Sequence, residues 1–312
     1  MLSHFFAKIK EEIKKPGLYA LLFLAYLFCV TGFFDKALAV GLLFLLFLVG
    51  VTILMTRKAG LADKKLYAVF FLALLFHLGA VLFIYYAHFN PFGGGADYQG
   101  YNQTAIELAS RFGHGNFSLA GLYTDHFWPI LIGILYMLVM PAMIVGQLFT
   151  VWLAAVAITL VYIIVLEIGG TKNIAFLASL ISAIYPSYLF FGSVLLKDTM
   201  VIPLALLGIL LILKMVKRFS LLNFLVFFAV LTALINLRFY IGYSILLSFI
   251  FSWPLLSALA IKKRMAYWLV MIFLLGFSSQ LVGNGYYGSG SFKTFFNPKS
   301  ITYYREVVYS AN

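Results

Sequence analysis

Long apolar runs dominate the chain, and short polar or basic stretches separate them. A transmembrane α-helix needs about 20 consecutive, mostly apolar residues. By that criterion the sequence predicts about nine membrane-spanning helices, and the expected fold class is all-α, a polytopic transmembrane helical bundle. The predicted spans are roughly 17–34, 38–55, 66–87, 144–167, 173–193, 199–214, 220–237, 239–261 and 266–283.

The polar stretches divide the chain into four predicted regions. Residues 1–16 place apolar and basic side chains at helical spacing, which predicts an interfacial amphipathic helix on an anionic membrane surface. Residues 17–65 predict a transmembrane hairpin, and 66–283 predict a transmembrane core. Residues 284–312 are expected to form an outer tail or the start of a longer outer loop.

One connection in the predicted core, 88–143, is much longer than the others. A loop of this length is usually functional or disordered, and this one is rich in aromatic residues. It contains two helix-like stretches, near 97–112 and 127–140. The second is apolar but too short to span, so we expect a juxtamembrane or re-entrant helix there.

The composition narrows the class of protein. Apolar residues make up 64% of the 312 positions and charged residues only 10%, whereas soluble domains carry about a quarter charged residues. This excludes a soluble globular enzyme and a disordered chain. The single cysteine, Cys29, cannot form an internal disulfide and belongs to no metal-binding motif. Neither a cofactor nor a divalent metal has a supporting motif, and the P-loop, HExxH and GxSxG signatures are absent from the sequence.

The distribution of basic residues predicts an orientation. With a cytoplasmic N-terminus and alternating spans, 15 of the 22 Lys and Arg residues lie on the cytoplasmic side, as the positive-inside rule expects. Because this orientation explains most of the basic residues, the net charge of +12 implies no nucleic acid or other anionic macromolecule as a partner. Membrane lipids are expected as partners of the spanning helices. Short loops and an apparently uncleaved N-terminus favour the inner (plasma) membrane of a bacterium. The seven outer basic residues are Lys36, Arg111, Lys197, Arg238, Lys293, Lys299 and Arg305.

A first candidate cluster follows the glycines at 93–95. Asp97 and Tyr101 are four residues apart, so they share one face of a helix. A carboxylate at a partly desolvated membrane rim can act as a general base on an acceptor. The structural alternative is that Asp97 caps the helix after a glycine loop.

A second cluster, Asp125 and His126, precedes the short helix that begins with Trp128 and Pro129. One His and one Asp are fewer than the three protein ligands of a catalytic zinc site, so a substrate contact is the functional interpretation. The alternative is a helix cap beside a belt of interfacial aromatic residues.

Two further clusters lie at the outer ends of predicted spans. Lys197 and Asp198 separate two apolar runs, and Arg238 sits in a turn with almost no other polar residue. Cations at this rim can bind a lipid-linked phosphate, and an arginine can do so with two hydrogen bonds. The alternatives are Asp198 as a helix cap with Lys197 extending to the interface, and Arg238 as an interface anchor.

In order and sidedness, these features resemble the GT-C superfamily of integral-membrane glycosyltransferases, in particular protein O-mannosyltransferase-like and aminoarabinose-transferase-like enzymes. The resemblance covers roughly 66–283. It is carried by Asp-x-x-x-Tyr at 97–101, a short Trp-Pro-led helix at 127–140, Tyr-Pro-Ser at 185–187 and Lys-Asp at 197–198.

The resemblance implies a donor sugar on a polyprenyl-phosphate carrier and an inverting transfer at the outer face. Asp97 would match the catalytic base, Lys197 and Asp198 the polar position of the second outer loop, and Arg238 a rim cation near the carrier phosphate. The acceptor could be a polysaccharide, a lipid or a protein. Two features depart from the family: an added N-terminal hairpin, and an end at Asn312 that implies a shortened member or an incomplete sequence.

Two other classes of function remain open on the sequence. A transporter or flippase of a lipid-linked intermediate would use the same rim cations without chemistry, and it would need polar residues across the bundle. A non-catalytic membrane scaffold would need none of these residues.

Overall fold

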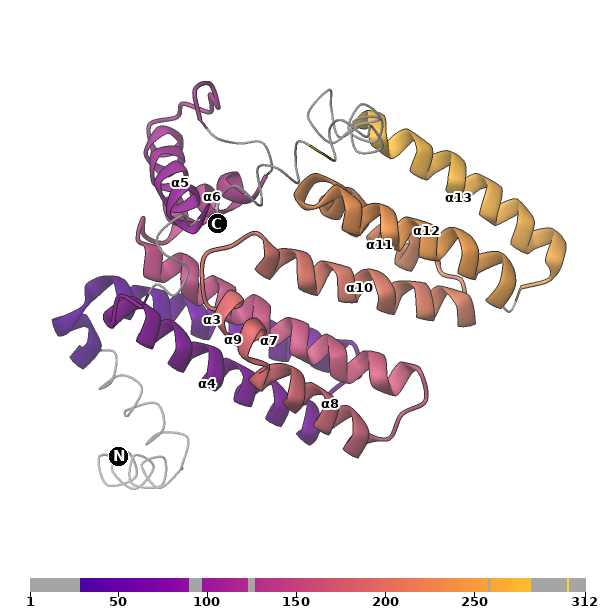
Figure 1. Cartoon of the computed structure of the whole chain (residues 1–312), viewed down its shortest axis with the longest axis horizontal. Coiled ribbons are helices and arrows are strands. Elements are labelled where there is room, and N and C mark those ends of the chain that lie inside the picture. The colour runs from indigo at the N-terminus through magenta and orange to yellow at the C-terminus, as the bar shows by residue number, and fades with distance from the viewer. Residues whose placement is uncertain (1–28, 90–96, 123–126, 258, 282–301, 303–312) are drawn as a thin grey trace, which may run out of the picture.

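The computed structural model describes residues 29–89, 97–122, 127–257, 259–281 and 302 (Figure 1). Within these ranges the regular structure is helical and contains no strand, which confirms the all-α prediction. The described helices are α3 (Lys36–Lys58), α4 (Lys64–Tyr86), α5 (Asp97–Gly113), α6 (Trp128–Leu138), α7 (Met143–Glu167), α8 (Lys172–Ile184), α9 (Pro186–Phe191), α10 (Asp198–Lys217), α11 (Leu221–Leu237), α12 (Phe239–Leu256) and α13 (Ile261–Leu281).

Five of these helices, α3, α4, α7, α10 and α12, are long and apolar enough to cross a membrane. The described residues therefore do not support nine spans. Helices α8 and α11 are apolar but have only 13 and 17 residues, fewer than the about 20 residues that a bilayer crossing typically needs. The predicted regions 1–16 and 284–312 lie outside the described residues except for Thr302, as does most of the predicted span 17–34.

The predicted span 173–193 is not one helix. Helix α8 ends at Ile184, Tyr185 is extended (ψ 118°), and Pro186 opens the six-residue helix α9. Proline lacks a backbone N–H and disfavours the α conformation of the residue before it, which explains the break. The non-helical segment 192–196 that follows α9 is largely buried.

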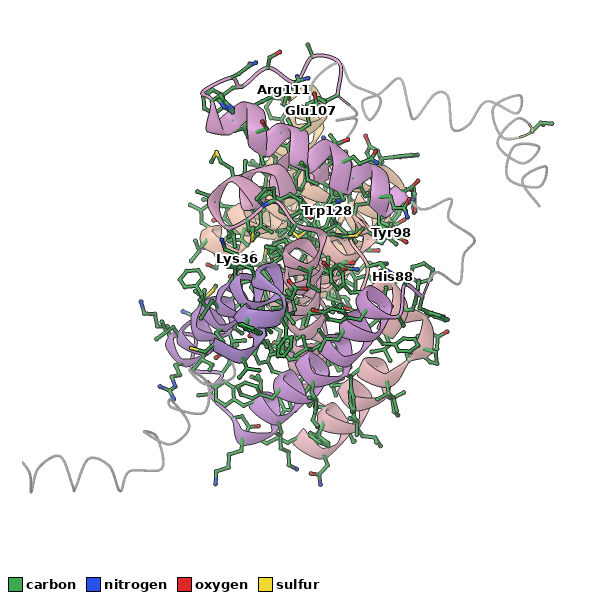
Figure 2. The ribbon with its side chains drawn as sticks, turned by 90° about the vertical axis from the view of Figure 1, so that its left-hand side faces the viewer. Lys36, His88, Tyr98, Glu107, Arg111 and Trp128 are labelled. Atoms are coloured by element: carbon green, nitrogen blue, oxygen red, sulfur yellow. The ribbon has the colours of Figure 1, made fainter. Side chains whose placement is uncertain are left out.

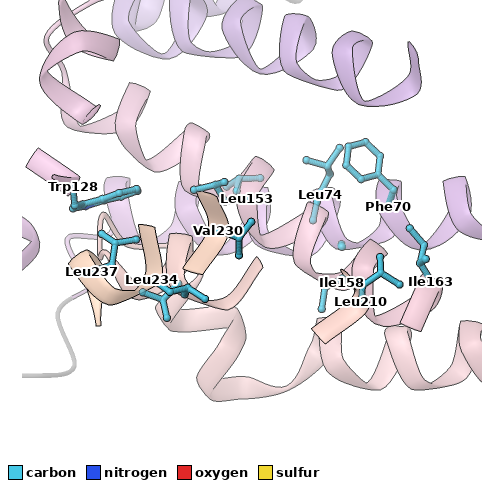
Figure 3. Close-up of a cluster of buried hydrophobic side chains, with 14 of the residues drawn as sticks. Phe70, Leu74, Trp128, Leu153, Ile158, Ile163, Leu210, Val230, Leu234 and Leu237 are labelled. Atoms are coloured by element: carbon cyan, nitrogen blue, oxygen red, sulfur yellow. The ribbon is translucent and has the colours of Figure 1, made fainter. Parts of the chain in front are cut away.

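Helix α7 is the centre of the bundle and packs against α3, α4, α8 and α10. Helix α10 extends the bundle to α11 and α12, and α13 packs on α12 at the edge (Figure 1). The core between them is apolar: Figure 3 shows Leu74 of α4, Ile158 of α7 and Leu210 of α10 among its side chains. Because the exposed outer faces are also apolar, as at Leu75, Phe47 and Leu247, the bundle has the surface of a membrane-embedded protein.

Contacts between helix termini define two opposite ends of the bundle. At the first, which we call the paired end, Tyr86 donates a hydrogen bond to Asp35 and Arg238 binds Asp198. The other, which we call the basic end, joins Asp63 to Lys172 and Glu167 to Lys217. Helices α5 and α6 pack against each other beside the paired end, at the left in Figure 1. The end that faces the cytoplasm stays a prediction from the charge count.

Candidate functional site

The centre of the paired end is an ion pair between Asp198 and Arg238. Asp198 is the first residue of α10, and Arg238 is the single residue that separates α11 from α12. The Arg238 Nε donates to Asp198 Oδ1 at 3.0 Å, and a terminal guanidinium nitrogen donates to Oδ2 at 2.7 Å. This two-point geometry fixes the orientation of the guanidinium as well as its position.

The surroundings keep Arg238 charged. Burial alone would lower the pKa of its guanidinium, but the hydrogen bond and negative charge of Asp198, together with Tyr240 and Tyr101, raise that pKa above its ordinary value. The alternative that Asp198 caps α10 is wrong, because Lys197 occupies the N-cap position and the Asp198 carboxylate faces Arg238. Lys197 is half-buried beside the pair.

Helix α5 brings Asp97 and Tyr101 to the same end. Asp97 opens the helix and is exposed, whereas Tyr101, one turn further, is buried and lies close enough to Arg238 to affect its pKa. In Figure 2, Tyr98 marks the N-terminal end of α5, and Glu107 and Arg111 mark its C-terminal half. The structure therefore brings Asp97, Tyr101, Asp198 and Arg238 to one end of the bundle.

Asp125 and His126 lie outside the described residues, which resume at Phe127, directly before α6. The backbone N–H of Phe127 donates to Asn236 Oδ1 at 2.9 Å. Asn236 stands two residues before Arg238, so this bond ties the start of α6 to the arginine. Asn236 was not among the site residues predicted from the sequence. An amide near the end of an otherwise apolar helix is the signal that could have found it.

An apolar crevice of about 320 Å³ lies between α7, α8, α9 and α10. Ile202 and Leu206 line it from α10, one and two turns after Asp198, so it extends from roughly 6 to 12 Å below the ion pair along the helix axis. The other lining residues are Ala157, Ile158, Val161, Ile181, Ser182, Tyr185 and Tyr188. Tyr185 and Ile181 are more than half exposed, so the crevice opens at the surface of the bundle.

A buried histidine contacts one wall of the crevice, and it was not among the site residues predicted from the sequence. His77, in the middle of α4, is completely buried, and its Nδ1 lies 3.3 Å from Ser193 Oγ. Tyr188, which lines the crevice, packs edge-on against its ring at 5.3 Å. The His77 Nε2 has no hydrogen-bond partner among the described residues. A single polar residue in an apolar helix was the available signal.

The described residues contain no group of three or more His, Cys, Asp or Glu side chains that could hold a metal ion. The paired end combines three features: the oriented guanidinium of Arg238, the exposed carboxylate of Asp97 and the apolar crevice along α10. Comparison of the chain with family models, curated proteins and solved structures gives no match.

Proposed function

We propose that the chain is a multi-pass membrane glycosyltransferase that moves a sugar from a polyprenyl-phosphate carrier to an acceptor at the outer face of the membrane. One observation carries the proposal: the Asp198–Arg238 pair lies at the same end as the Asp97 helix and above an apolar crevice on α10. A fixed cation above an apolar crevice is complementary to a lipid phosphate and its hydrocarbon chain.

In this proposal the crevice takes part of the isoprenoid chain and Arg238 holds the phosphate. Asp198 engages two nitrogens of the guanidinium, and the third nitrogen carries two more N–H donors that can bind a phosphate oxygen. Lys197 adds positive charge beside it. During transfer the bond between the anomeric carbon and the phosphate oxygen breaks. The leaving phosphate gains negative charge, which these cations stabilise.

Asp97 acts as the general base. The acceptor oxygen or nitrogen forms the new bond to the anomeric carbon, and its proton passes to the Asp97 carboxylate. The carboxylate lies in the first turn of α5. Its exposure leaves room for an acceptor to approach.

The test is Asp97→Asn in the full chain, reconstituted in vesicles with a radiolabelled polyprenyl-phosphate sugar and a crude acceptor fraction. We expect sugar transfer to fall by about 10²–10⁴-fold, the usual contribution of a general base, with folding and insertion unchanged. Glu107→Gln is the matched control, because it removes another exposed carboxylate of α5 and should leave transfer unchanged. Undiminished transfer by Asp97→Asn would refute the mechanism.

A transporter of a lipid-linked intermediate is the second candidate, and His77 is the observation that favours it. Ionisable residues buried among membrane-spanning helices often mark a substrate or proton pathway. A His77→Ala chain that keeps sugar transfer but no longer moves a fluorescent lipid-linked sugar between leaflets would select this function. Transfer and movement that both persist would reject it.

A further inference from the structure

The basic end carries exposed cations from four separate helix termini. Lys58 closes α3, Lys64 opens α4, Arg218 follows α10, and Lys262 and Lys263 open α13. Contacts across this end bring the last two groups together, because Phe219, next to Arg218, stacks on Tyr267 of α13 with ring centroids 4.9 Å apart. Because this contact joins the segment after α10 to the first turns of α13, we treat Arg218, Lys262 and Lys263 together and call them the α10–α13 patch.

The carboxylates described at this end are already engaged within the chain. Asp63 accepts a hydrogen bond from Tyr162 at 2.6 Å and faces Lys172 at 3.5 Å. Glu167 pairs with Lys217 at 2.8 Å. Within the described ranges, none of the three cations of the α10–α13 patch makes an ion pair with a carboxylate. Their charge is therefore available to an external anion.

Exposed hydrocarbon borders the same cations. Leu222, in the first turn of α11 after Arg218, is 69% exposed, and Ile261, directly before Lys262, is 70% exposed. Cations beside exposed apolar side chains match a phospholipid, whose phosphate adjoins its acyl chains. A nucleic acid or an acidic soluble protein would neutralise the cations but leave the apolar side chains uncovered.

We propose that the α10–α13 patch is a docking surface for anionic phospholipid headgroups, with Leu222 and Ile261 against the acyl chains. This site lies at the end of the bundle opposite Asp97, and it does not depend on the glycosyltransferase proposal. Helices α11 and α13 meet there, so bound lipid would bridge two helices at the edge of the bundle.

The test is equilibrium binding of radiolabelled phosphatidylglycerol to the full chain in mixed detergent micelles. We expect the Arg218→Gln/Lys262→Gln/Lys263→Gln variant to bind at least about tenfold more weakly, because each basic residue near the surface contributes to binding of an anionic lipid. Arg218→Lys/Lys262→Arg/Lys263→Arg, which preserves the charges, should bind like the wild type. Lys36→Gln removes an exposed cation at the paired end and should also have no effect.

Competition by unlabelled compounds against the radiolabelled phosphatidylglycerol distinguishes a lipid from other kinds of anionic partner. Unlabelled phosphatidylglycerol should displace the label, whereas phosphatidylcholine and chain-free glycerol phosphate should not. Equal competition by phosphatidylcholine would overturn the charge argument, and equal competition by glycerol phosphate or a short oligonucleotide would overturn the lipid argument. Unchanged binding by the triple Gln variant would overturn the proposal as a whole.

Discussion

Both ends of the bundle contain ion pairs, but the Arg238–Asp198 pair at the paired end differs in geometry and exposure from the Lys217–Glu167 pair, one of two at the basic end. At the paired end, the side chains of Arg238 and Asp198 are 31% and 35% exposed and share two hydrogen bonds. At the basic end, the Lys217 side chain is 58% exposed and reaches Glu167 through a single ammonium group. The first pair holds one cation in one orientation, whereas the second neutralises an acid at a surface that remains strongly basic.

This difference separates two uses of charge. A chemical step on a phosphate needs a cation whose position is fixed before the substrate arrives, because reorganisation would cost binding energy. A lipid surface needs several mobile cations that adapt to headgroups of varying position. The comparison therefore supports a specific phosphate site at the paired end and a diffuse lipid contact at the basic end.

The largest expected effect is that of separating Arg238 from Asp198. Arg238→Ala or Asp198→Ala should each lower the free energy of unfolding by about 2–3 kcal/mol, below the 3–5 kcal/mol of a fully buried pair because both side chains are one-third exposed. Thermal unfolding in detergent would measure this. The double variant should lose less than the sum of the two single variants. Additive losses would show that the pair does not act as a unit.

An intermediate effect is expected at Asp63, and it depends on pH. The hydrogen bond from Tyr162 is the main cause that lowers the pKa of Asp63, and Lys172 adds to it. Because the pKa is lower in the folded state, its stabilisation is present above the unfolded pKa of about 4 and is lost as the pH falls through the folded value.

The unfolding temperature of Asp63→Asn should therefore fall less than that of the wild type when the pH is lowered from about 5 to about 3. Tyr162→Phe, which removes the strongest interaction with Asp63, should reduce this fall nearly as much. A wild-type acid profile in both variants would mean that Asp63 does not link stability to pH.

The smallest effect is expected at the exposed pair. Lys217→Gln should change the free energy of unfolding by no more than about 1 kcal/mol, because exposed ion pairs contribute little and salt screens them. Unfolding temperatures measured at low and high salt would test this. A loss as large as that of Arg238→Ala would remove the distinction between the two ends.

The sequence by itself determined the helical class and most helix positions. The predicted spans 38–55, 66–87, 144–167 and 199–214 coincide closely with α3, α4, α7 and α10. The stretches near 97–112 and 127–140 coincide with α5 and α6. Apolar run length and proline position are local properties, so these elements could be predicted without knowledge of the packing. Pro186 could have indicated a break in the sequence, but the long apolar run around it led to the prediction of one continuous span.

Only the tertiary structure decided which polar residues meet. Asp198 pairs with Arg238 rather than with its neighbour Lys197, Asn236 binds the backbone of Phe127, and His77 faces Ser193. These partners are 40 to 116 residues apart. Hydropathy fixes which segments are helical, but the partner of a polar side chain depends on how each helix is rotated and shifted against its neighbours. In this bundle those rotations follow from the packing around α7.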